Sequence, residues 1–308
     1  MRLLSLFSGI GAFEKALTNL NIDYELVGFS EIDKWAIKSY CAIHNISEDL
    51  NLGDISKIKD EDIPNADLVT YGFPCQDISV AGLQKGIKEG TRSGLLYEAE
   101  RVIKTIKPRY AIAENVKNLV GKKHKNDFDE LLKRLDAYGY NNYWKVLNAK
   151  DFGIPQNRER VFIISIRKDI DVGVFKFPDK IEIKSLNFRD FLTKNALYLE
   201  EKDYNKVKGL GAEYNFGGRV AKQNEKIYGT ITANYGKVSG NSMKFEENNK
   251  YRYLNTLECW RLMGFSDKDY NEVKKLKHSE NQMYKQAGNS ICVNVLEGIF
   301  KKLFEVQE

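Results

Sequence analysis

Two short apolar runs end in residues that can do chemistry. Cys75 follows the run 67–73, and Glu114 and Asn115 follow the run 110–113. A cysteine can act as a nucleophile, and a carboxyl group can take up or release a proton. In an open α/β sheet, groups at the carboxyl ends of neighbouring strands face one crevice. The pattern therefore predicts a nucleophile and an acid presented to the same substrate.

Cys75 also fits the commonest role of a lone cysteine, which is a buried apolar side chain. Its surroundings favour the nucleophile, because Pro74 and Gln76 flank it and a polar segment with three glycines, residues 77–93, follows. A loop of this kind can close over a substrate and exclude water. Glu114 likewise has an ordinary explanation as an acid at the end of a strand.

Two arginines begin a third apolar run. Arg158 and Arg160 stand two residues apart, directly before residues 161–166. They can be read as surface charge. In the functional interpretation both reach into the crevice of Cys75 and Glu114 from one edge of a strand.

A glycine-rich turn follows the first apolar run. Residues 7–11 read Phe-Ser-Gly-Ile-Gly and open a helical stretch, so a ligand can approach the backbone beside the positive end of a helix. Glu31 ends the second run, where an acid is well placed for ribose hydroxyls. Asp54 and Ile55 add an acceptor and an apolar wall for an adenine. Each has a structural explanation alone; together they predict an adenosine-containing cofactor. A P-loop signature is absent.

These residues need a scaffold, and residues 1–167 alternate strand-like and helical stretches as βαβ units on a parallel sheet do. From about Lys168 glycines and scattered aromatics replace this pattern, which predicts a separate, loop-rich domain without a persistent helical period. The last stretch, 290–304, is helical again. The expected strands are 3–7, 24–29, 68–71, 110–114, 142–147 and 160–166, and the expected helices are 12–19, 34–44, 95–107 and 127–138.

The composition excludes several classes of protein. With 308 residues, 42% hydrophobic and 30% charged, the chain is globular rather than disordered. No apolar stretch approaches the ~20 residues of a membrane span, and no signal cleavage site follows the first residues, so we expect a cytoplasmic protein without a membrane partner. Four scattered cysteines without a CxxC pair argue against a metal site and a disulfide framework. Most of the net charge of +5 lies in residues 168–280, which fits a solvated surface or a phosphate-facing module.

In this order, and over nearly the whole chain, the motifs resemble those of the cytosine-C5 DNA methyltransferase family. The resemblance implies an α/β fold. It consists of a Rossmann-like S-adenosylmethionine-dependent methyltransferase domain, residues 1–184 completed by 281–308, and a small, loop-rich β-containing target-recognition domain with its hinge, residues 185–280. The matching segments are Phe7–Gly11, Glu31, Asp54-Ile55, Pro74-Cys75-Gln76, Glu114-Asn115-Val116, Gln156–Arg160, Arg252–Leu254, Glu258–Gly264 and Gln286–Ser290.

The resemblance also implies the reaction. The Cys75 thiolate adds to C6 of a flipped-out cytosine, Glu114 interacts with N3, and C5 takes the methyl group of S-adenosylmethionine. Loss of the C5 proton and of the thiolate then releases 5-methylcytosine and S-adenosylhomocysteine. Arg160 and Arg158 steady the base and its backbone, and Asn115 orients the region of Glu114. No metal takes part.

The binding residues follow from the same resemblance. Thr230 is expected at the phosphate of the flipped nucleotide, although residues 230–236 also fit a turn in a small β domain. The implied cofactor residues are Phe7, Ser8, Gly9, Gly11, Glu31, Ile32, Asp54, Ile55, Pro74, Leu95, Asn289 and Ser290. The implied DNA contacts are Gln76, Ser79, Ala81, Arg92, Thr230 and Tyr235.

The expected partner is double-stranded DNA, bound by a monomer that protects it from a cognate restriction endonuclease. A recognition module of roughly 70–90 residues suggests a short target of ~4–5 base pairs, because so small a surface makes few base contacts. One alternative is a transfer-RNA methyltransferase of the same superfamily, but its Cys-Phe-Thr triplet is absent. The other is a catalytically inactive DNA-binding homologue, which would have no need of Cys75, Glu114 and Arg160 together.

Overall fold

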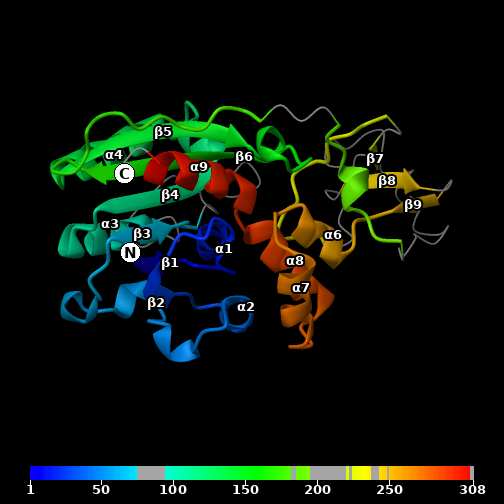
Figure 1. Cartoon of the computed structure of the whole chain (residues 1–308), viewed down its shortest axis with the longest axis horizontal. Helices are drawn as coiled ribbons and strands as arrows, with labels where there is room; N and C mark the ends of the chain where they lie inside the picture. Colours follow the sequence, from blue (N-terminus) through cyan, green and yellow to red (C-terminus); the bar gives the residue numbers. More distant parts are fainter. Residues whose placement is uncertain are drawn as a thin grey trace. The chain divides into compact units, whose positions relative to one another are not determined.

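The computed structural model describes residues 1–74, 94–181, 185–194, 220–221, 224–236, 243–247 and 250–305. The chain divides into two compact units (Figure 1). Unit 1 contains Met1–Leu147, Glu159–Asp179 and Leu296–Glu308, and unit 2 contains Asn148–Arg158 and Lys180–Val295. Unit 2 thus takes residues 148–158, 180–184 and 281–295, which the predicted domain division assigned to the catalytic domain. That division concerns function and stays a prediction.

Unit 1 is built on a six-stranded sheet with the order β2-β1-β3-β4-β6-β5. Strands β1, β2, β3 and β4 run parallel, whereas β6 runs antiparallel to β4. The prediction of a parallel sheet is therefore confirmed for these four strands and wrong for β6, whose chain returns by way of the neighbouring β5 rather than by a crossover helix. The strands are β1 (Arg2–Leu6), β2 (Glu25–Ser30), β3 (Leu68–Tyr71), β4 (Tyr110–Val116), β5 (Tyr140–Asn148) and β6 (Glu159–Arg167).

Alternation along the strands sends side chains to both faces of this sheet. One face, with Leu4, Val69 and Ala111, packs in a single core with α3 (Leu95–Ile106) and α4 (Lys125–Ala137). On the other face, the Tyr110 ring meets Phe304 of α9 (Val293–Glu305) at 5.8 Å, and Phe300 of α9 meets Phe13 of α1 (Ala12–Asn19) at 6.4 Å. Helices on both faces bury the sheet and leave its strand ends to carry polar groups.

The remaining helix of this unit, α2 (Lys34–His44), begins where its sequence supplies a cap: Asp33 accepts a hydrogen bond from the Trp35 N–H at 3.0 Å. Four short 3₁₀ helices connect these elements. They are η1 (Glu48–Leu50), η2 (Ile55–Lys57), η3 (Asp60–Asp62) and η4 (Lys117–Val120).

Unit 2 combines a small sheet with short helices. Its three strands have the order β7-β8-β9, with β7 (Val220–Ala221), β8 (Lys244–Glu247) and β9 (Lys250–Arg252). The 3₁₀ helices η5 (Ala149–Phe152) and η6 (Phe188–Phe191) precede them, and α6 (Thr256–Arg261), α7 (Asp267–Lys274) and α8 (Glu280–Asn289) follow. The sheet confirms the β-containing domain.

The expectation that no helix persists in this region is wrong for α6, α7 and α8. Two of them start at capping boxes, Asn255 with Glu258 and Ser266 with Asp269, in which each side chain bonds the backbone of the other residue. A capping residue followed three positions later by an acid is a signal for a helix start. The signal was present in the sequence, but the helices are too short to show a sustained period.

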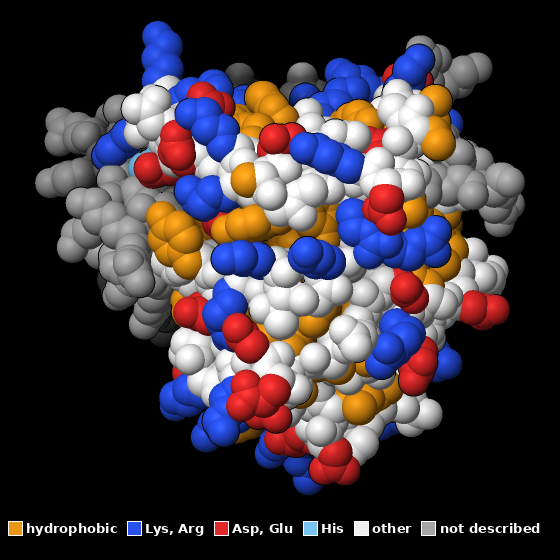
Figure 2. Space-filling model, turned by 90° about the vertical axis from the view of Figure 1, so that its left-hand side faces the viewer, with side chains coloured by type: hydrophobic (Ala, Val, Ile, Leu, Met, Phe, Trp, Pro, Cys, Tyr) orange, Lys and Arg blue, Asp and Glu red, His pale blue; other side chains and the backbone are white. Residues whose placement is uncertain are grey.

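The surface mixes charges of both signs. On the face that Figure 2 displays, Lys and Arg side chains are interspersed with Asp and Glu, and hydrophobic side chains form small patches between them. No helix among the described residues is long and apolar enough to span a membrane. In the same residues, His, Cys, Asp and Glu side chains nowhere gather into a group that could hold a metal ion.

Candidate active site and cofactor site

The carboxylate of Glu114 stands at the carboxyl end of β4 in an ion pair. Nε of Arg160, at the start of β6, lies 3.0 Å from Glu114 Oε1, and the two side chains are 12% and 17% exposed. Arg160 also donates to the carbonyl oxygen of Glu159 at 2.8 Å. Because β6 is antiparallel to β4, its first residues lie beside the last residues of β4. The reversed strand thus brings an arginine to an acid that remains within reach of a ligand.

Asn115 connects this site to the root of the predicted nucleophile loop. Its side chain is 3% exposed, and Nδ2 donates to the Phe73 carbonyl oxygen at 3.0 Å while Oδ1 accepts from Val116 N at 2.9 Å. Strands β3 and β4 are neighbours, with Tyr71 paired to Ala113. The chain that leads to Cys75 and the chain that carries Glu114 therefore leave the sheet side by side. Cys75 itself lies outside the described residues.

The glycine-rich turn after β1 needs left-handed backbone. Phe7, Gly9 and Gly11 have φ values of 55°, 58° and 79°. A Cβ on Gly11 would lie 2.1 Å from Nε2 of His44, which approaches the Ile10 carbonyl oxygen at 3.2 Å. Glycine is required here on both counts, conformation and space. The turn ends β1 one residue earlier than predicted and directs the chain into α1.

Glu31 ties this turn to the end of β2. Its Oε2 accepts a hydrogen bond from Gly9 N at 2.9 Å, and its Oε1 accepts from Ile32 N and Asp33 N, both at 2.8 Å. The side chain of Ile32 next to it is 72% exposed. A fixed carboxylate beside an exposed apolar side chain suits a ligand that has both hydroxyl groups and an aromatic ring.

Sequence reasoning missed Asn51, which holds the second and third cofactor segments together. Asn51 Oδ1 accepts from Glu31 N at 3.2 Å and Gly53 N at 3.1 Å, and its Nδ2 donates to the Glu31 carbonyl oxygen at 3.2 Å. The signal was the sequence Asn51-Leu52-Gly53, because an asparagine side chain commonly bonds the backbone two residues on.

Asp54 caps η2 and is partly exposed. Its Oδ1 accepts from Ser56 N at 3.1 Å and Ser56 Oγ at 2.7 Å. The hydrogen bond from the Ser56 hydroxyl is the main cause that lowers the pKa of Asp54, with help from the backbone N–H and from Lys57. Ile55 beside it is 2% exposed and belongs to the core. Asp54 therefore places a charged hydrogen-bond acceptor next to the buried apolar side chain of Ile55.

These segments fit an adenosine-containing cofactor. The hydroxyl of Ser8 is buried and has no hydrogen-bond partner among the residues that the structure describes, which is a costly arrangement unless a ligand supplies the partner. Beside it lie the Gly9–Gly11 backbone, the Glu31 carboxylate and the N-terminus of α1. Pro74 is partly buried after β3, and Leu95 is partly buried at the first position of α3.

Arg158 differs from its neighbour Arg160. It belongs to unit 2 and is 3% exposed. Its Nη1 donates to the Ile231 carbonyl oxygen at 2.8 Å, and its Nη2 donates to the carbonyl oxygens of Gly288 at 2.9 Å and Ser290 at 2.7 Å. These bonds occupy the terminal amino groups of Arg158 with the backbone of unit 2. Its predicted role in steadying the base stays a prediction.

The two described DNA-contact candidates also differ. Thr230 is exposed, and its Oγ1 donates to the Asn157 carbonyl oxygen at 2.6 Å, which leaves the oxygen able to accept. Tyr235 is 3% exposed. Its hydroxyl lies 2.6 Å from the Tyr228 hydroxyl and accepts from Leu254 N at 3.0 Å. Ring and hydroxyl of Tyr235 are thus buried and bonded within unit 2, and the predicted DNA contact of Tyr235 stays a prediction.

The other predicted residues are placed as follows. Asn289 is exposed at the end of α8, and Ser290 is 8% exposed; both lie in unit 2, and their part in the cofactor site stays a prediction. Cys75, Gln76, Ser79, Ala81 and Arg92 lie outside the described residues.

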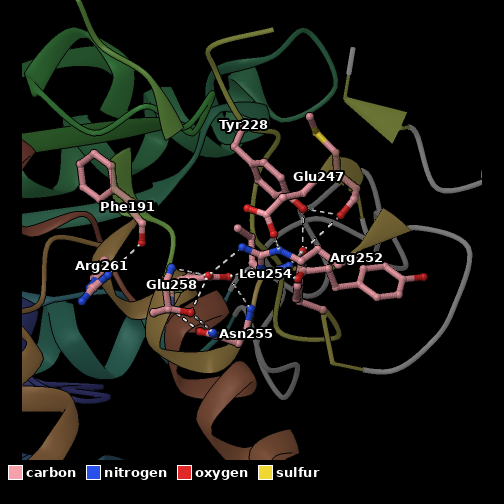
Figure 3. A network of polar contacts seen from close by, with 12 residues as sticks. Phe191, Tyr228, Glu247, Arg252, Leu254, Asn255, Glu258 and Arg261 are labelled. Carbon is pink, nitrogen blue, oxygen red and sulfur yellow. Dashed lines mark hydrogen bonds and ion pairs between the residues drawn. The ribbon is translucent and has the colours of Figure 1, made fainter. Parts of the chain in front are cut away.

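A buried ion pair braces unit 2 (Figure 3). Arg252 and Glu258 are both 0% exposed and form two contacts, Nη1 to Oε2 at 2.8 Å and Nη2 to Oε1 at 3.1 Å. Arg252 also pairs with Glu247, and Glu258 accepts from Asn255 N at 2.8 Å and Thr193 N at 2.7 Å. The pair thus fixes the end of the small sheet to the start of α6.

Known proteins resemble the chain over its full length. The type II methyltransferase M2.ScrFI of Lactococcus lactis subsp. cremoris is 37% identical, and the match covers 100% of both chains. The orphan methyltransferase M.SPBetaI of Bacillus phage SPbeta is 34% identical over 98% of this chain and 97% of the phage protein. The crystal structure of S. pombe Dnmt2 methyltransferase has the same fold, with a TM-score of 0.76 over 99% of both chains at 22% identity.

The family comparison agrees with these relatives. Residues 1–305 match the C-5 cytosine-specific DNA methylases, so the match includes both units and all the segments described above. The chain belongs to this family and is a DNA (cytosine-5-)-methyltransferase.

Proposed function

We propose that the enzyme methylates cytosine within one short DNA sequence through a covalent bond between Cys75 and C6 of a flipped-out base. The observation that carries this proposal is the Glu114–Arg160 pair at the end of β4, next to the strand that leads to Cys75. The arrangement offers a proton-handling carboxyl group at the point where the nucleophile loop begins.

C5 of cytosine is a weak nucleophile, and the residues present can activate it. The Cys75 thiolate adds to C6, and the carboxyl group of Glu114, in its protonated form, gives a proton to N3, so that electron density moves to C5. N3 returns this proton when the thiolate leaves. Arg160 keeps the Glu114 carboxylate in place through its 3.0 Å contact. Bound S-adenosylmethionine supplies the methyl group that C5 takes up. A base then removes the C5 proton, the electrons return to the ring, and the thiolate leaves C6. Covalent catalysis of this kind divides one difficult step into easier ones.

The thiol must lose its proton before it reacts. A free cysteine has a pKa near ~8.5, so the active site has to stabilise the thiolate. The family uses S-adenosylmethionine as its methyl donor. In this chain Ser8, the Gly9–Gly11 backbone, Glu31 and Asp54 would hold it, with Ile32 against the adenine.

The target base has to leave the duplex. Flipping costs a few kcal/mol of stacking and pairing energy, roughly the range known for such enzymes. Contacts with the phosphate backbone offset this cost, and exposed Thr230 is the described residue that we assign to the phosphate of the flipped nucleotide.

We further propose that the target is short and that the enzyme acts as a monomer beside a cognate restriction endonuclease. A small recognition module supports the first point, since it can make few base contacts. The relatives include both a type II methyltransferase and an orphan methyltransferase, so the endonuclease needs its own test. That test is to digest target DNA, methylated or not, with extracts of the source cells.

The central test uses a host without cytosine methylation. Wild-type enzyme and the Cys75→Ser variant are expressed there, and 5-methylcytosine is mapped at base resolution in the recovered DNA. We expect methylation in one short context with the wild type and none with the variant. Cys41→Ser is the matched control, because Cys41 is a partly buried thiol on α2 outside the predicted site, and it should leave the map unchanged.

Two results would overturn the proposal. Methylation that persists in Cys75→Ser would remove the covalent step. Unmodified DNA from soluble wild-type enzyme, together with methyl transfer to tRNA in vitro, would assign the enzyme to an RNA substrate.

A further inference from the structure

Two segments of unit 2 with different predicted ligands are joined by one buried side chain. The segment 230–233 carries Thr230, which we assign to a DNA phosphate, and the segment 288–290 carries Asn289 and Ser290, which we assign to the cofactor. Nη1 of Arg158 donates to the carbonyl oxygen of Ile231 in the first segment. Nη2 donates to the Gly288 and Ser290 carbonyl oxygens in the second.

The segment that contains Arg158 fixes residue 231 on both sides. Gln156, which is 0% exposed, accepts from Ile231 N at 3.0 Å through Oε1 and donates to the Leu262 carbonyl oxygen at 2.7 Å through Nε2. The hydroxyl of Thr230 donates to the Asn157 carbonyl oxygen. Residues 230 and 231 therefore cannot shift without breaking contacts to residues 156–158.

The two segments also pack directly on each other. A Cβ on Gly288 would lie 2.2 Å from the Thr232 carbonyl carbon and 2.3 Å from the Ala233 amide nitrogen. No side chain larger than hydrogen fits at this contact, and the neighbours that it would meet are backbone atoms. Glycine allows the backbone of the second segment to lie against the backbone of the first.

We propose that Arg158 is a positioning residue that couples DNA binding to cofactor binding. It holds the phosphate-side segment and the cofactor-side segment in one arrangement, so a ligand that orders either segment also orders the other. This inference rests on the proposed roles of Thr230, Asn289 and Ser290. An arginine suits the position, because its planar guanidinium can donate hydrogen bonds to several carbonyl oxygens at once. The ammonium of lysine is a compact point charge without this fork of donors.

Coupling of two sites is reciprocal and can be measured as a ratio of affinities. The probes are S-adenosylhomocysteine and a duplex that contains the mapped target. The dissociation constant of S-adenosylhomocysteine is measured by calorimetry with and without saturating duplex. We expect the duplex to tighten binding to wild-type enzyme by a factor within the usual range of about 5–150. In Arg158→Met we expect that factor to fall to about 1.

Two further variants separate positioning from general stability. A lysine in Arg158→Lys can donate to some of the carbonyl oxygens that Arg158 contacts. This variant should therefore retain part of the tightening of S-adenosylhomocysteine binding by the duplex. Gly288→Ala leaves Arg158 intact but forces the two segments apart, and it should lower the factor as Arg158→Met does. Arg261→Met is the control, because the Arg261 side chain in the same unit donates to the Phe191 carbonyl oxygen (Figure 3) and pairs with Asp267, neither of which belongs to the two segments. It should keep the wild-type factor.

The outcomes distinguish this inference from the proposed function. A residue that only stabilises unit 2 lowers the amount of folded enzyme, which urea unfolding of each variant reports, and leaves the ratio of affinities unchanged. A factor of about 1 in the wild type, or a wild-type factor in both Arg158→Lys and Arg158→Met, would overturn the coupling. Wild-type enzyme that binds neither probe would instead contradict the proposed function.

Discussion

Arg160 and Arg158 are separated by one residue, and the two units use them in opposite ways. In unit 1 Arg160 is 17% exposed and pairs with an acid that is itself 12% exposed. In unit 2 Arg158 is 3% exposed, and its terminal amino groups meet three backbone carbonyl oxygens. The residue type is the same, but the first arginine pairs with the acid that we propose acts on the base, and the second is bonded to the backbone of unit 2.

The same contrast holds for the ion pairs of the two units. Glu114 and Arg160 lie at strand ends where a substrate can replace water, whereas Arg252 and Glu258 are both 0% exposed and bond each other and the backbone. A buried charge must be fully partnered to be tolerated, and once partnered it has little left for a ligand. Exposure, more than charge, therefore separates the proposed catalytic acid, Glu114, from the structural acid, Glu258.

The largest expected effect is on the chemistry of unit 1. Glu114→Gln keeps the shape of the side chain but removes the carboxylate, so methyl transfer should fall by about 10²–10⁴-fold, the usual contribution of general acid–base catalysis. The measurement is the turnover rate on target duplex with labelled S-adenosylmethionine. Urea unfolding should change little.

Glu159→Gln is the matched control for this variant. Glu159 pairs with Lys117 on the surface, with the side chains 41% and 57% exposed, and it should keep nearly wild-type turnover. Equal losses in both variants would mean that the site depends on surface charge rather than on the acid at the end of β4.

In unit 2 the expected effect is on stability. Arg252→Met leaves the Glu258 carboxylate buried without its partner, which should lower the free energy of unfolding by about 3–5 kcal/mol. Lys133→Met removes one side of an exposed pair, Lys133 with Glu130, and should lower the free energy of unfolding far less, because solvent screens an exposed pair. Urea unfolding of both variants makes the comparison. A small loss in Arg252→Met would show that this pair is not the brace of unit 2.

Most strands and helices of unit 1 could be predicted from the sequence, because the signals that mark them lie within the elements themselves or next to them. Runs of apolar residues that end in Cys75, Glu114 or Gly9 mark strand ends, and the strands and helices lie close to the expected ranges. The reversal of β6 was missed, since strand direction depends on the return through β5 and not on the residues of β6. The burial of Arg158 and Tyr235 was not predicted, because the carbonyl oxygens and hydroxyls that hold them are 7 to 132 residues away in sequence.

A smaller effect is expected at the proposed cofactor site of unit 1. Asn51→Ala removes the acceptor for two backbone N–H groups and a donor to the Glu31 carbonyl oxygen. Glu31 should then lose its fixed position, and S-adenosylhomocysteine binding should weaken by about 1–3 kcal/mol, the cost of unsatisfied buried groups. Calorimetry measures the change.

Asn51→Asp is the comparison variant, because it keeps the acceptor for the two N–H groups, loses the donor to the Glu31 carbonyl oxygen and adds a negative charge. It should retain more of the affinity than Asn51→Ala. If the two variants bind equally, Glu31 does not depend on the Asn51 acceptor.

The smallest effect concerns pH, and both units should share it. Burial, and then the hydrogen bond to Asp171, raise the pKa of Tyr143 to about 12, and burial raises the pKa values of Tyr228 and Tyr235 well above 10.0. Below the ordinary tyrosine pKa of about 10 these groups are protonated whether the chain is folded or unfolded. Their contribution to the free energy of unfolding is therefore fully present there. As the pH rises from about 10 toward 12, the unfolded chain ionises first and stability falls.

Urea midpoints between about pH 9 and pH 11.5 measure this decline. Tyr143→Phe removes one ionising group and should decline less steeply than wild type. An identical slope would mean that the Tyr143 hydroxyl ionises as readily in the fold as in the unfolded chain.

Trapping of the enzyme on DNA tests the central claim most directly. A target duplex with 5-fluorocytosine at the methylated position blocks the last step. C5 then carries fluorine in place of the proton that the base must remove, so the thiolate cannot be eliminated. A covalent adduct formed by a cysteine therefore persists. With S-adenosylmethionine present, the wild type should form an adduct that survives denaturation and maps to Cys75. Cys75→Ser should form none, and Glu114→Gln should form it much more slowly. An adduct at another residue, or methyl transfer by Cys75→Ser, would contradict the account.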